Sequence, residues 1–146
     1  QNAESQNKAL VVDQRIFSNG NSYFGSWSAG RMHGHGEYTW SDSSVYKGEF
    51  VDGYMWGKGE KTWPNERKYV GDWRKDSMWG VGEMSWPSGE TYVGAFRKGM
   101  FHGEGIRTWP NGDKYSGEFR NGEQQGQGTF ESVEQNQIHA SSMDKS

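Results

Sequence analysis

Residues 92–114 read YVGAFRKGMFHGEGIRTWPNGDK, a 23-residue unit that the rest of the chain repeats. Units aligned on the first tyrosine begin, without insertion or deletion, at Tyr23, Tyr46, Tyr69, Tyr92 and Tyr115, and we number repeat positions 1 to 23 from this tyrosine. All 22 glycines fall at positions 3, 8, 12, 14 and 21, and all three prolines at position 19. So strict a period predicts a repeat architecture instead of one closed core.

Two stretches of each unit alternate with a period of two, Y-x-G-x-[WF] and G-x-G-x-x-x-W, and each predicts a strand. About six residues separate them, such as 97–102, so we expect a hairpin loop there. The W-P-N-G segment is turn chemistry, because proline presets φ and Asn-Gly tolerates positive φ. The prediction is an all-β fold, an elongated single-layer antiparallel meander of tandem β-hairpins with about eleven strands, twisted and curled.

The alternation also predicts which side chains share a face of the sheet. If positions 5 and 12 face each other across the hairpin, the rings at positions 1, 5 and 18 form an aromatic ladder beside the glycines at positions 3, 12 and 14. The opposite face is then solvated and polar. Its members are Glu49, Asp72, Glu118, Lys58, Glu60, Glu83, Thr62 and Thr108.

The repeat resembles the MORN (membrane occupation and recognition nexus) repeat, whose pattern is Y-x-G-x-[WF]-x-x-G-x-x-H-G-x-G. The units that begin at Tyr23 and Tyr92 match every position, whereas Trp56, Trp79 and Gln125 replace the histidine and Asp76 replaces a glycine in the others. The resemblance covers roughly residues 17–130. It implies an interaction module, of a kind found in lipid kinases, membrane-junction proteins, cytoskeletal scaffolds and plastid-division regulators.

The repeats predict the organisation of the chain. We expect a lead-in and capping strand at 1–16, a half repeat at 17–22 within a repeat domain at 17–130, and a polar tail at 131–146. Because the chain opens with glutamine, we expect it to be a piece of a longer protein or a processed form. It contains no cysteine, which fits an intracellular protein, and no apolar run near the ~20 residues of a membrane span. The resemblance adds the expectation of a location peripheral to a membrane or in an organelle such as a plastid.

Catalytic, metal and cofactor sites are not expected. The pair His33 and His35 does not recur in the other repeats, and its G-x-G enters a strand instead of a helix N-terminus that would hold a phosphate. The glutamates Glu37, Glu60 and Glu83 recur because the surface repeats, not as acid and base of one site. A net charge of −3 gives no reason to expect nucleic acid.

Large apolar residues at positions 10 and 11 are unexpected, because the sequence places them in hairpin loops, which are usually polar. They either fold back over the aromatic ladder or line a groove for an amphipathic helix or extended peptide, and the two roles can coexist. The candidate partner-binding residues are Met32, Met55, Trp56, Met78, Trp79, Phe101 and His102.

A second row, at positions 6 and 7, is basic and consists of Arg74, Lys75, Arg97, Lys98 and Arg120. These residues are either ordinary solvated hairpin shoulders or a weak, salt-sensitive contact with acidic lipid headgroups, in line with the lipid binding proposed for the family that the chain resembles.

We therefore expect a non-enzymatic scaffold that binds a peptide or helix of another protein, with self-association as a homodimer a further expectation, and that regulates a cytoskeletal, division or membrane-attached assembly. The alternatives are a module that binds acidic lipids such as phosphoinositides and a regulatory domain of a larger enzyme.

Overall fold

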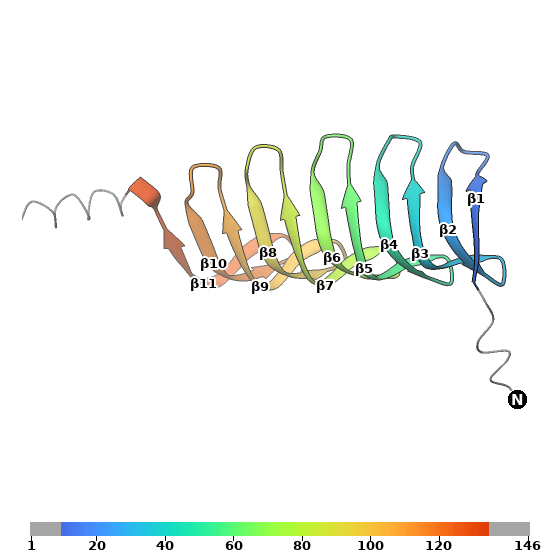
Figure 1. Ribbon diagram of the computed structural model, residues 1–146. Helices are drawn as coiled ribbons and strands as arrows, with labels where there is room; N and C mark the ends of the chain where they lie inside the picture. The colour runs from blue at the N-terminus through green and yellow to red at the C-terminus, as the bar shows by residue number, and fades with distance from the viewer. Residues whose placement is uncertain (1–9, 135–146) are drawn as a thin grey trace, which may run out of the picture.

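The computed structural model describes residues 10–134, which form one antiparallel sheet of eleven strands (Figure 1). The strands lie in the sheet in chain order, from β1 at one edge to β11 at the other, so the topology is an uninterrupted meander. The all-β hairpin array predicted from the 23-residue period is confirmed. The strands are β1 Val11–Ile16, β2 Ser22–Ser28, β3 Arg31–Thr39, β4 Val45–Val51, β5 Tyr54–Thr62, β6 Lys68–Arg74, β7 Ser77–Ser85, β8 Thr91–Arg97, β9 Met100–Thr108, β10 Lys114–Arg120 and β11 Glu123–Glu131.

The two strands of each repeat are joined by a turn of only two residues, at positions 7 and 8. In the turn Asp52-Gly53 the φ angles are 49° and 90°, and both angles are also positive in the other four turns. Two successive positive φ values define the type I′ turn, whose twist suits a hairpin. The prediction of a six-residue loop is therefore wrong, and positions 9 to 11 lie inside β3, β5, β7, β9 and β11.

Consecutive repeats are joined at the other end by the W-P-x-G turns. The amide of Trp109 donates to the carbonyl of Asp113 at 2.8 Å, and the amide of Gly112 donates back to Trp109 at 2.8 Å. The same pair of hydrogen bonds closes the turns that begin at Phe17, Trp40, Trp63 and Trp86. These turns are located where the sequence predicts them.

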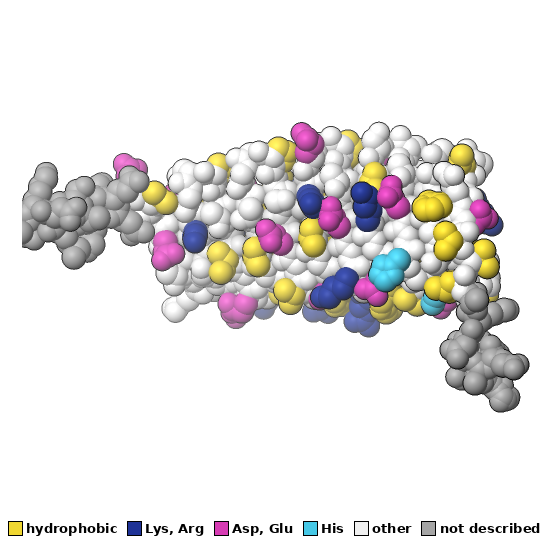
Figure 2. All heavy atoms as spheres, in the orientation of Figure 1, with side chains coloured by type: hydrophobic (Ala, Val, Ile, Leu, Met, Phe, Trp, Pro, Cys, Tyr) yellow, Lys and Arg dark blue, Asp and Glu magenta, His cyan; other side chains and the backbone are white. Residues whose placement is uncertain are grey.

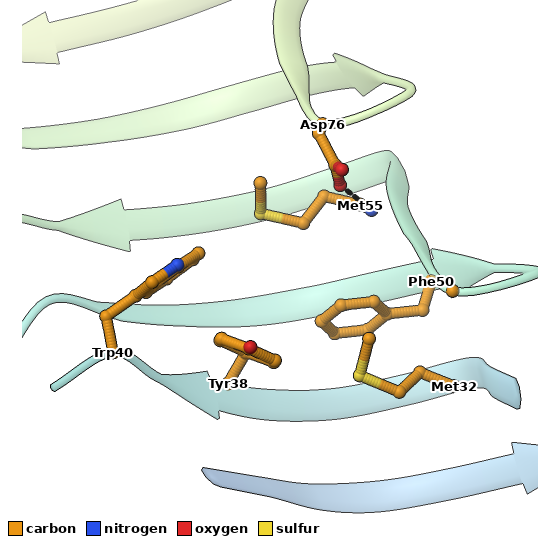
Figure 3. Close-up of a pocket in the computed structure, with 7 residues that line it drawn as sticks. Met32, Tyr38, Trp40, Phe50, Met55 and Asp76 are labelled. Atoms are coloured by element: carbon orange, nitrogen blue, oxygen red, sulfur yellow. Dashed lines mark hydrogen bonds between the residues drawn. The ribbon is translucent and has the colours of Figure 1, made fainter. Parts of the chain in front are cut away.

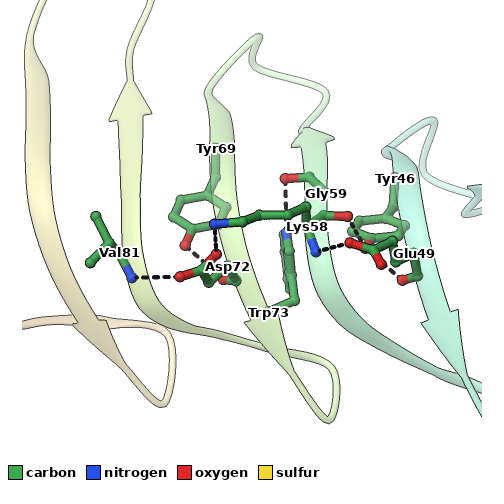
Figure 4. Close-up of polar contacts among 8 residues, drawn as sticks. All are labelled: Tyr46, Glu49, Lys58, Gly59, Tyr69, Asp72, Trp73 and Val81. Atoms are coloured by element: carbon green, nitrogen blue, oxygen red, sulfur yellow. Dashed lines mark hydrogen bonds and ion pairs between the residues drawn. The ribbon is translucent and has the colours of Figure 1, made fainter.

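A bulge interrupts the pairing within each hairpin, at position 4 in the first four repeats and between positions 3 and 4 in the last. Gly48 pairs with Gly59 and Phe50 with Met55, so the single residue Glu49 faces three residues, 56–58. The carboxylate of Glu49 accepts the amide of Lys58 at 2.6 Å, and in the next repeat Asp72 accepts the amide of Val81 at 3.2 Å (Figure 4). These acidic side chains close the bulge by satisfying an amide that has left the strand ladder.

The bulge corrects the predicted pairing of positions 5 and 12. Within a hairpin, position 5 pairs with position 10, as Phe50 does with Met55. Positions 5 and 12 meet between neighbouring hairpins, as Phe50 does with Gly34. Position 12 has a positive φ in all five repeats, for example 94° at Gly57, so its glycine serves the bulge.

The sheet is folded along its length, because every hairpin bends near its bulge. Figure 1 shows the W-P-x-G turns in one row at the top and the two-residue turns curving behind at the bottom. We call the part with positions 1–3 and 14–23 the first limb, and the part with positions 5–11 the second limb. The fold gives the single-layer sheet an inner side, and the core lies there.

The core is a row of tyrosines that alternate with the rings at position 5. Tyr23, Tyr46, Tyr69 and Tyr92 have no exposed surface. Tyr46 makes edge contacts with Phe50 of its own repeat and with Trp73 of the next, both at 5.1 Å between ring centroids. The phenol of Tyr46 donates to the carbonyl of Glu49 at 2.8 Å, three residues ahead, and the other position-1 tyrosines do the same. The predicted aromatic ladder is therefore present.

The two edges differ from the middle of the sheet. All six residues of β1, the predicted capping strand, are exposed, and β1 pairs with β2. Beyond β11, the amide of Val133 donates to the carboxylate of Asp113 at 2.9 Å, and Val133 covers the turn glycine Gly112. Residues 1–9 of the predicted lead-in and residues 135–146 of the predicted polar tail lie outside the described residues.

Candidate partner-binding groove

The inner side of the bend is a groove between the two limbs, which we call the concave groove. Position 10 of the second limb lines one wall, and positions 16 and 18 of the first limb line the other. The side chains at these positions lie on the same face of the sheet as the buried rings at positions 1 and 5, so they point inward. The lining residues are Met32, Met55, Met78 and Phe101 at position 10, Tyr38, Lys61, Met84 and Arg107 at position 16, and Trp40, Trp63, Trp86 and Trp109 at position 18.

A cavity in the concave groove lies between the first and second repeats (Figure 3). Figure 3 shows Met32, Tyr38, Trp40 and Phe50 directed toward a common space from β3, β4 and the turn after β3. Met55, Gly53 and Asp76 complete the wall of a cavity of about 310 Å³. The lining side chains are mainly aromatic and thioether, with the carboxylate of Asp76 and the phenol of Tyr38 as polar groups, which suits apolar side chains that carry a polar neighbour.

The lip of this cavity is held by Asp76, which stands where the other repeats have glycine. Asp76 has a φ of 71°, a left-handed conformation that aspartate tolerates. Its carboxylate accepts the amide of Met55 at 2.8 Å, and its own amide donates to the carbonyl of Met55 at 3.0 Å (Figure 3). Asp76 therefore ties the turn of the third repeat to the groove wall of the second.

The structure divides the seven candidate partner-binding residues between two faces. Met32, Met55, Met78 and Phe101 lie in the concave groove, where Met55 is 6% exposed and the other three are half-buried. Phe101 stacks on Tyr92 with 3.9 Å between ring centroids, so part of this row covers the core as well as lining the groove.

The remaining three candidates, Trp56, Trp79 and His102, lie on the outer face of the second limb. They follow the position-10 residues directly, and neighbouring residues of a strand point to opposite faces. Trp56 is 38% exposed. His102 accepts the amide of Asn121 at 3.4 Å through Nδ1, which links two repeats from outside.

The basic row shares this outer face with the tryptophans. The indole of Trp79 has the guanidinium of Arg74 at 5.1 Å on one side and that of Arg97 at 5.8 Å on the other. Arg120 is exposed at the corresponding position of the last repeat, while Lys75 and Lys98 occupy the two-residue turns. Figure 2 shows one face of the molecule, on which charges of both signs alternate with separate apolar side chains.

The first limb contributes groove residues that the candidate set omits. Trp40, Trp63, Trp86 and Trp109 pack against the core while part of each ring stays exposed. The sequence places them on the aromatic face, but it does not show that the bend sets them opposite the position-10 row. The recurrence of tryptophan beside a turn, where a smaller residue would suffice, is the signal that was available.

Cations lie on the faces of these tryptophans. The ammonium of Lys61 is 4.0 Å from the ring centroid of Trp40 and 5.0 Å from that of Trp63. The guanidinium of Arg67 is 4.0 Å from the centroid of Trp63. Burial among the rings lowers the pKa of Lys61 and that of Arg67, because the apolar walls disfavour the charged forms. Such contacts combine apolar and cationic character in one wall.

The described part of the chain gathers no group of three or more His, Cys, Asp or Glu side chains suited to a metal ion. Within the same residues, no helix is long and apolar enough to span a membrane. His33, the first residue of the His-Gly-His motif, accepts the amide of Asp52 at 3.2 Å through Nδ1. That contact gives the histidine a structural role between two repeats.

Comparison with known families agrees with this architecture. The family model described as MORN repeat matches residues 23–45, 46–66, 69–91, 92–114 and 115–137. A comparison with curated proteins found no match. The matched segments cover most of the chain and follow its hairpins, and the chain therefore belongs to the MORN-repeat family.

Proposed function

We propose that the protein is a scaffold that binds an apolar segment of another protein, as an amphipathic helix or an extended peptide, along its concave groove. MORN repeats are commonly interaction repeats for proteins or membranes, and the choice between these targets has to come from this chain's own surfaces. The segment would lie along the row of repeats, with its apolar side chains between the methionines of the second limb and the tryptophans of the first.

The observation that carries the proposal is the cavity of about 310 Å³ bounded by Met32, Trp40 and Phe50. Tryptophan and methionine are typical of surfaces that bind peptides, because they offer large contact areas and methionine adapts its shape. The outer face of the first limb lacks such a row of Trp and Met. Its exposed apolar residues are Phe24, Val70, Val93 and Ile106, of which Val93 and Ile106 pair directly.

Selection from a displayed library of random 16-residue peptides tests the proposal. The protein serves as bait, and titration calorimetry measures the affinity of each enriched peptide. The Met32→Gln variant places an amide in the cavity wall and should weaken binding at least tenfold. The matched control is Trp56→Ala, on the opposite face of the sheet in the next repeat, which should bind like the parent. Melting curves verify that both variants are folded.

Two results would contradict the proposal. The first is a selection that enriches no peptide. The second is a set of peptides whose affinity falls with Trp56→Ala and not with Met32→Gln, since the binding surface would then be the outer face of the second limb.

A second candidate function is contact with acidic lipid, and the placement of Trp79 between Arg74 and Arg97 favours it. An interfacial tryptophan flanked by cations suits the boundary between headgroups and water. Flotation with vesicles that contain anionic lipid, in low and high salt, measures this binding. If the outer face binds lipid, Arg74→Gln with Arg97→Gln should abolish flotation, whereas Met32→Gln should not change it.

The wider expectations stay predictions. They are a homodimer, a role in a cytoskeletal, division or membrane-attached assembly, and the alternative of a regulatory domain of a larger enzyme.

A further inference from the structure

The second and fourth repeats each carry a cation at groove position 16, but the residue beside it differs. In the fourth repeat, Nε of Arg107 donates to the carboxylate of Glu90 at 2.6 Å, and both side chains are largely shielded from water. In the second repeat the cation is Lys61, and the residue equivalent to Glu90 is Ser44, which is 2% exposed and carries no charge. The groove therefore supplies a carboxylate to Arg107 and none to Lys61.

Arg67 adds a second cation without a carboxylate on the ring of Trp63, which Lys61 also contacts. Arg67 occupies repeat position 22, as Glu90 does one repeat later. The position-16 residue that corresponds to it, as Arg107 corresponds to Glu90, is the apolar Met84. Nε of Arg67 is buried, and it has no hydrogen-bond partner among the described residues. Burial is the main cause of the lowered pKa of Lys61, and the positive charge of Arg67 lowers it further.

The acidic groups close enough to act on Lys61 are already used by backbone amides. The carboxylate of Asp42 accepts the amide of Ser44 at 2.8 Å, and the carboxylate of Asp76 accepts the amide of Met55 at 2.8 Å. Within residues 10–134, neither Lys61 nor Arg67 forms an ion pair. Two cations thus contact Trp63 in the groove wall, and neither has a carboxylate partner among the described residues.

We propose that Lys61 and Arg67, held on the faces of Trp40 and Trp63, form a subsite for a carboxylate of the bound peptide segment. An aspartate or glutamate side chain would play the part that Glu90 plays for Arg107, with the planar arginine fork and the ammonium donating to its oxygens. The flanking indoles would contact the carbon stem of that side chain. This inference rests on the proposed function, and it names the partner as an acidic amphipathic segment.

The peptide selection described above gives the first measurement. The enriched sequences should share an aspartate or glutamate at a fixed distance from their apolar residues. In a synthetic enriched peptide, replacement of that acid by its amide should weaken binding to the parent about tenfold, the size of one charge-assisted contact of about 1.4 kcal/mol.

Two variants remove the subsite in different ways. The double variant Lys61→Met, Arg67→Met removes both positive charges from the subsite. Methionine is chosen because it already occupies position 16 in the third repeat. Ser44→Glu gives Lys61 an internal carboxylate, as Glu90 does for Arg107. Both variants should lose the preference for the acidic peptide over its amide form. The matched control, Arg107→Met with Glu90→Gln, removes an internally paired cation and should keep the preference, and melting curves check that each variant folds.

The outcomes separate the subsite from the proposed function. Two results would overturn the subsite but not the proposed groove. In the first, the enriched peptides bind through Met32 but share no acidic residue. In the second, the Lys61→Met, Arg67→Met variant keeps the parent's preference for the acidic peptide. A selection without enriched peptides overturns both. A third result is that the parent binds no peptide but floats with anionic vesicles, whereas the Lys61→Met, Arg67→Met variant does not float. The two cations would then recognise lipid headgroups, and the inference of a peptide carboxylate would be wrong.

Discussion

The position-1 tyrosine is a polar residue in the centre of an apolar core, and its surroundings explain why this side chain recurs. The ring fills the space that the glycines at positions 3 and 14 leave open, and its hydroxyl reaches a backbone carbonyl three residues ahead. A phenylalanine would fill the same space but leave that buried carbonyl without the donor. Each tyrosine is thus both a core residue and a clamp on its bulge.

Glycine at position 14 should be intolerant of any side chain. A Cβ on Gly59 would collide with the ring of Tyr46. We expect Gly59→Ala to lower the free energy of unfolding by about 1 to 3 kcal/mol, because the fully buried ring has no room to move. Urea unfolding measures the change. The control is Val81→Ala, on the outer face at 61% exposure, which should stay within about 0.5 kcal/mol of the parent.

The tyrosines also predict a loss of stability in alkali. Burial raises the pKa of Tyr23 and that of Tyr92 to about 12, and raises the pKa of Tyr46 and of Tyr69 as well. Because the folded pKa lies above the unfolded value of about 10, the stabilisation is complete below pH ~10 and decreases as the pH rises toward 12.

Urea unfolding at pH 8 and pH 11, with ultraviolet absorbance of the phenolate, measures this pH dependence. Tyr23→Phe should lose less stability over the interval than the parent, since one titrating group is gone. Equal unfolding free energies of the parent at the two pH values would contradict the prediction.

At the scale of the hairpin, the sequence predicts the strands, the W-P-x-G turns and the inward rings, because a period of two and turn chemistry are local properties. It does not predict the bulge. The bulge places three residues opposite the single residue Glu49, and this leaves the alternation of inward and outward side chains unchanged on both sides of it. The period-of-two pattern in the sequence is therefore the same with or without a bulge. Asp52-Gly53 and Asn121-Gly122 are typical of two-residue hairpin turns and would have shortened the expected loop.

The two-residue turn limits how much of the candidate site can be predicted from the sequence. A loop lets Met55 and Trp56 share one surface, whereas a strand sends them to opposite faces. The structure therefore places the position-10 residues in the concave groove and the position-11 tryptophans on the outer face, so the seven candidates do not share one surface. The sequence pattern does not identify the first-limb tryptophans as groove residues. They lie opposite the methionines only because the hairpins bend, and the bend depends on contacts between residues that are distant in the sequence.

The turns allow a stabilising substitution. Ala29 has a φ of 51°, and alanine has no side-chain group to compensate for this left-handed conformation. Ala29→Asn produces the Asn-Gly sequence that type I′ turns prefer and should raise the free energy of unfolding by about 0.5 to 1 kcal/mol. The reciprocal change, Asn121→Ala, should lower it by a similar amount. Urea unfolding of both variants tests the pair, and a less stable Ala29→Asn protein would contradict it.

For the whole molecule, each strand pairs only with its immediate neighbours in the chain, so stability depends on position along the array. Every residue of β1 and of β11 is exposed, while the strands between them bury the tyrosine row. We expect amide hydrogen exchange to be slowest in β5 to β8 and faster toward both edges. Mass spectrometry of peptic fragments measures the gradient. Uniform protection from β1 to β11 would show that the sheet opens in one step.

The constant repeat length has a geometric consequence for any helix that lies in the concave groove. Two strand spacings advance the sheet by about 9.6 Å per repeat, whereas an α-helix rises about 1.5 Å per residue. One repeat therefore corresponds to between six and seven helical residues, slightly short of the seven that return a side chain to the same face. A straight helix would drift out of phase with the Trp and Met rows after a few repeats, so a single ligand helix stays in phase over a limited number of hairpins, and a longer partner has to bend or supercoil to match them all.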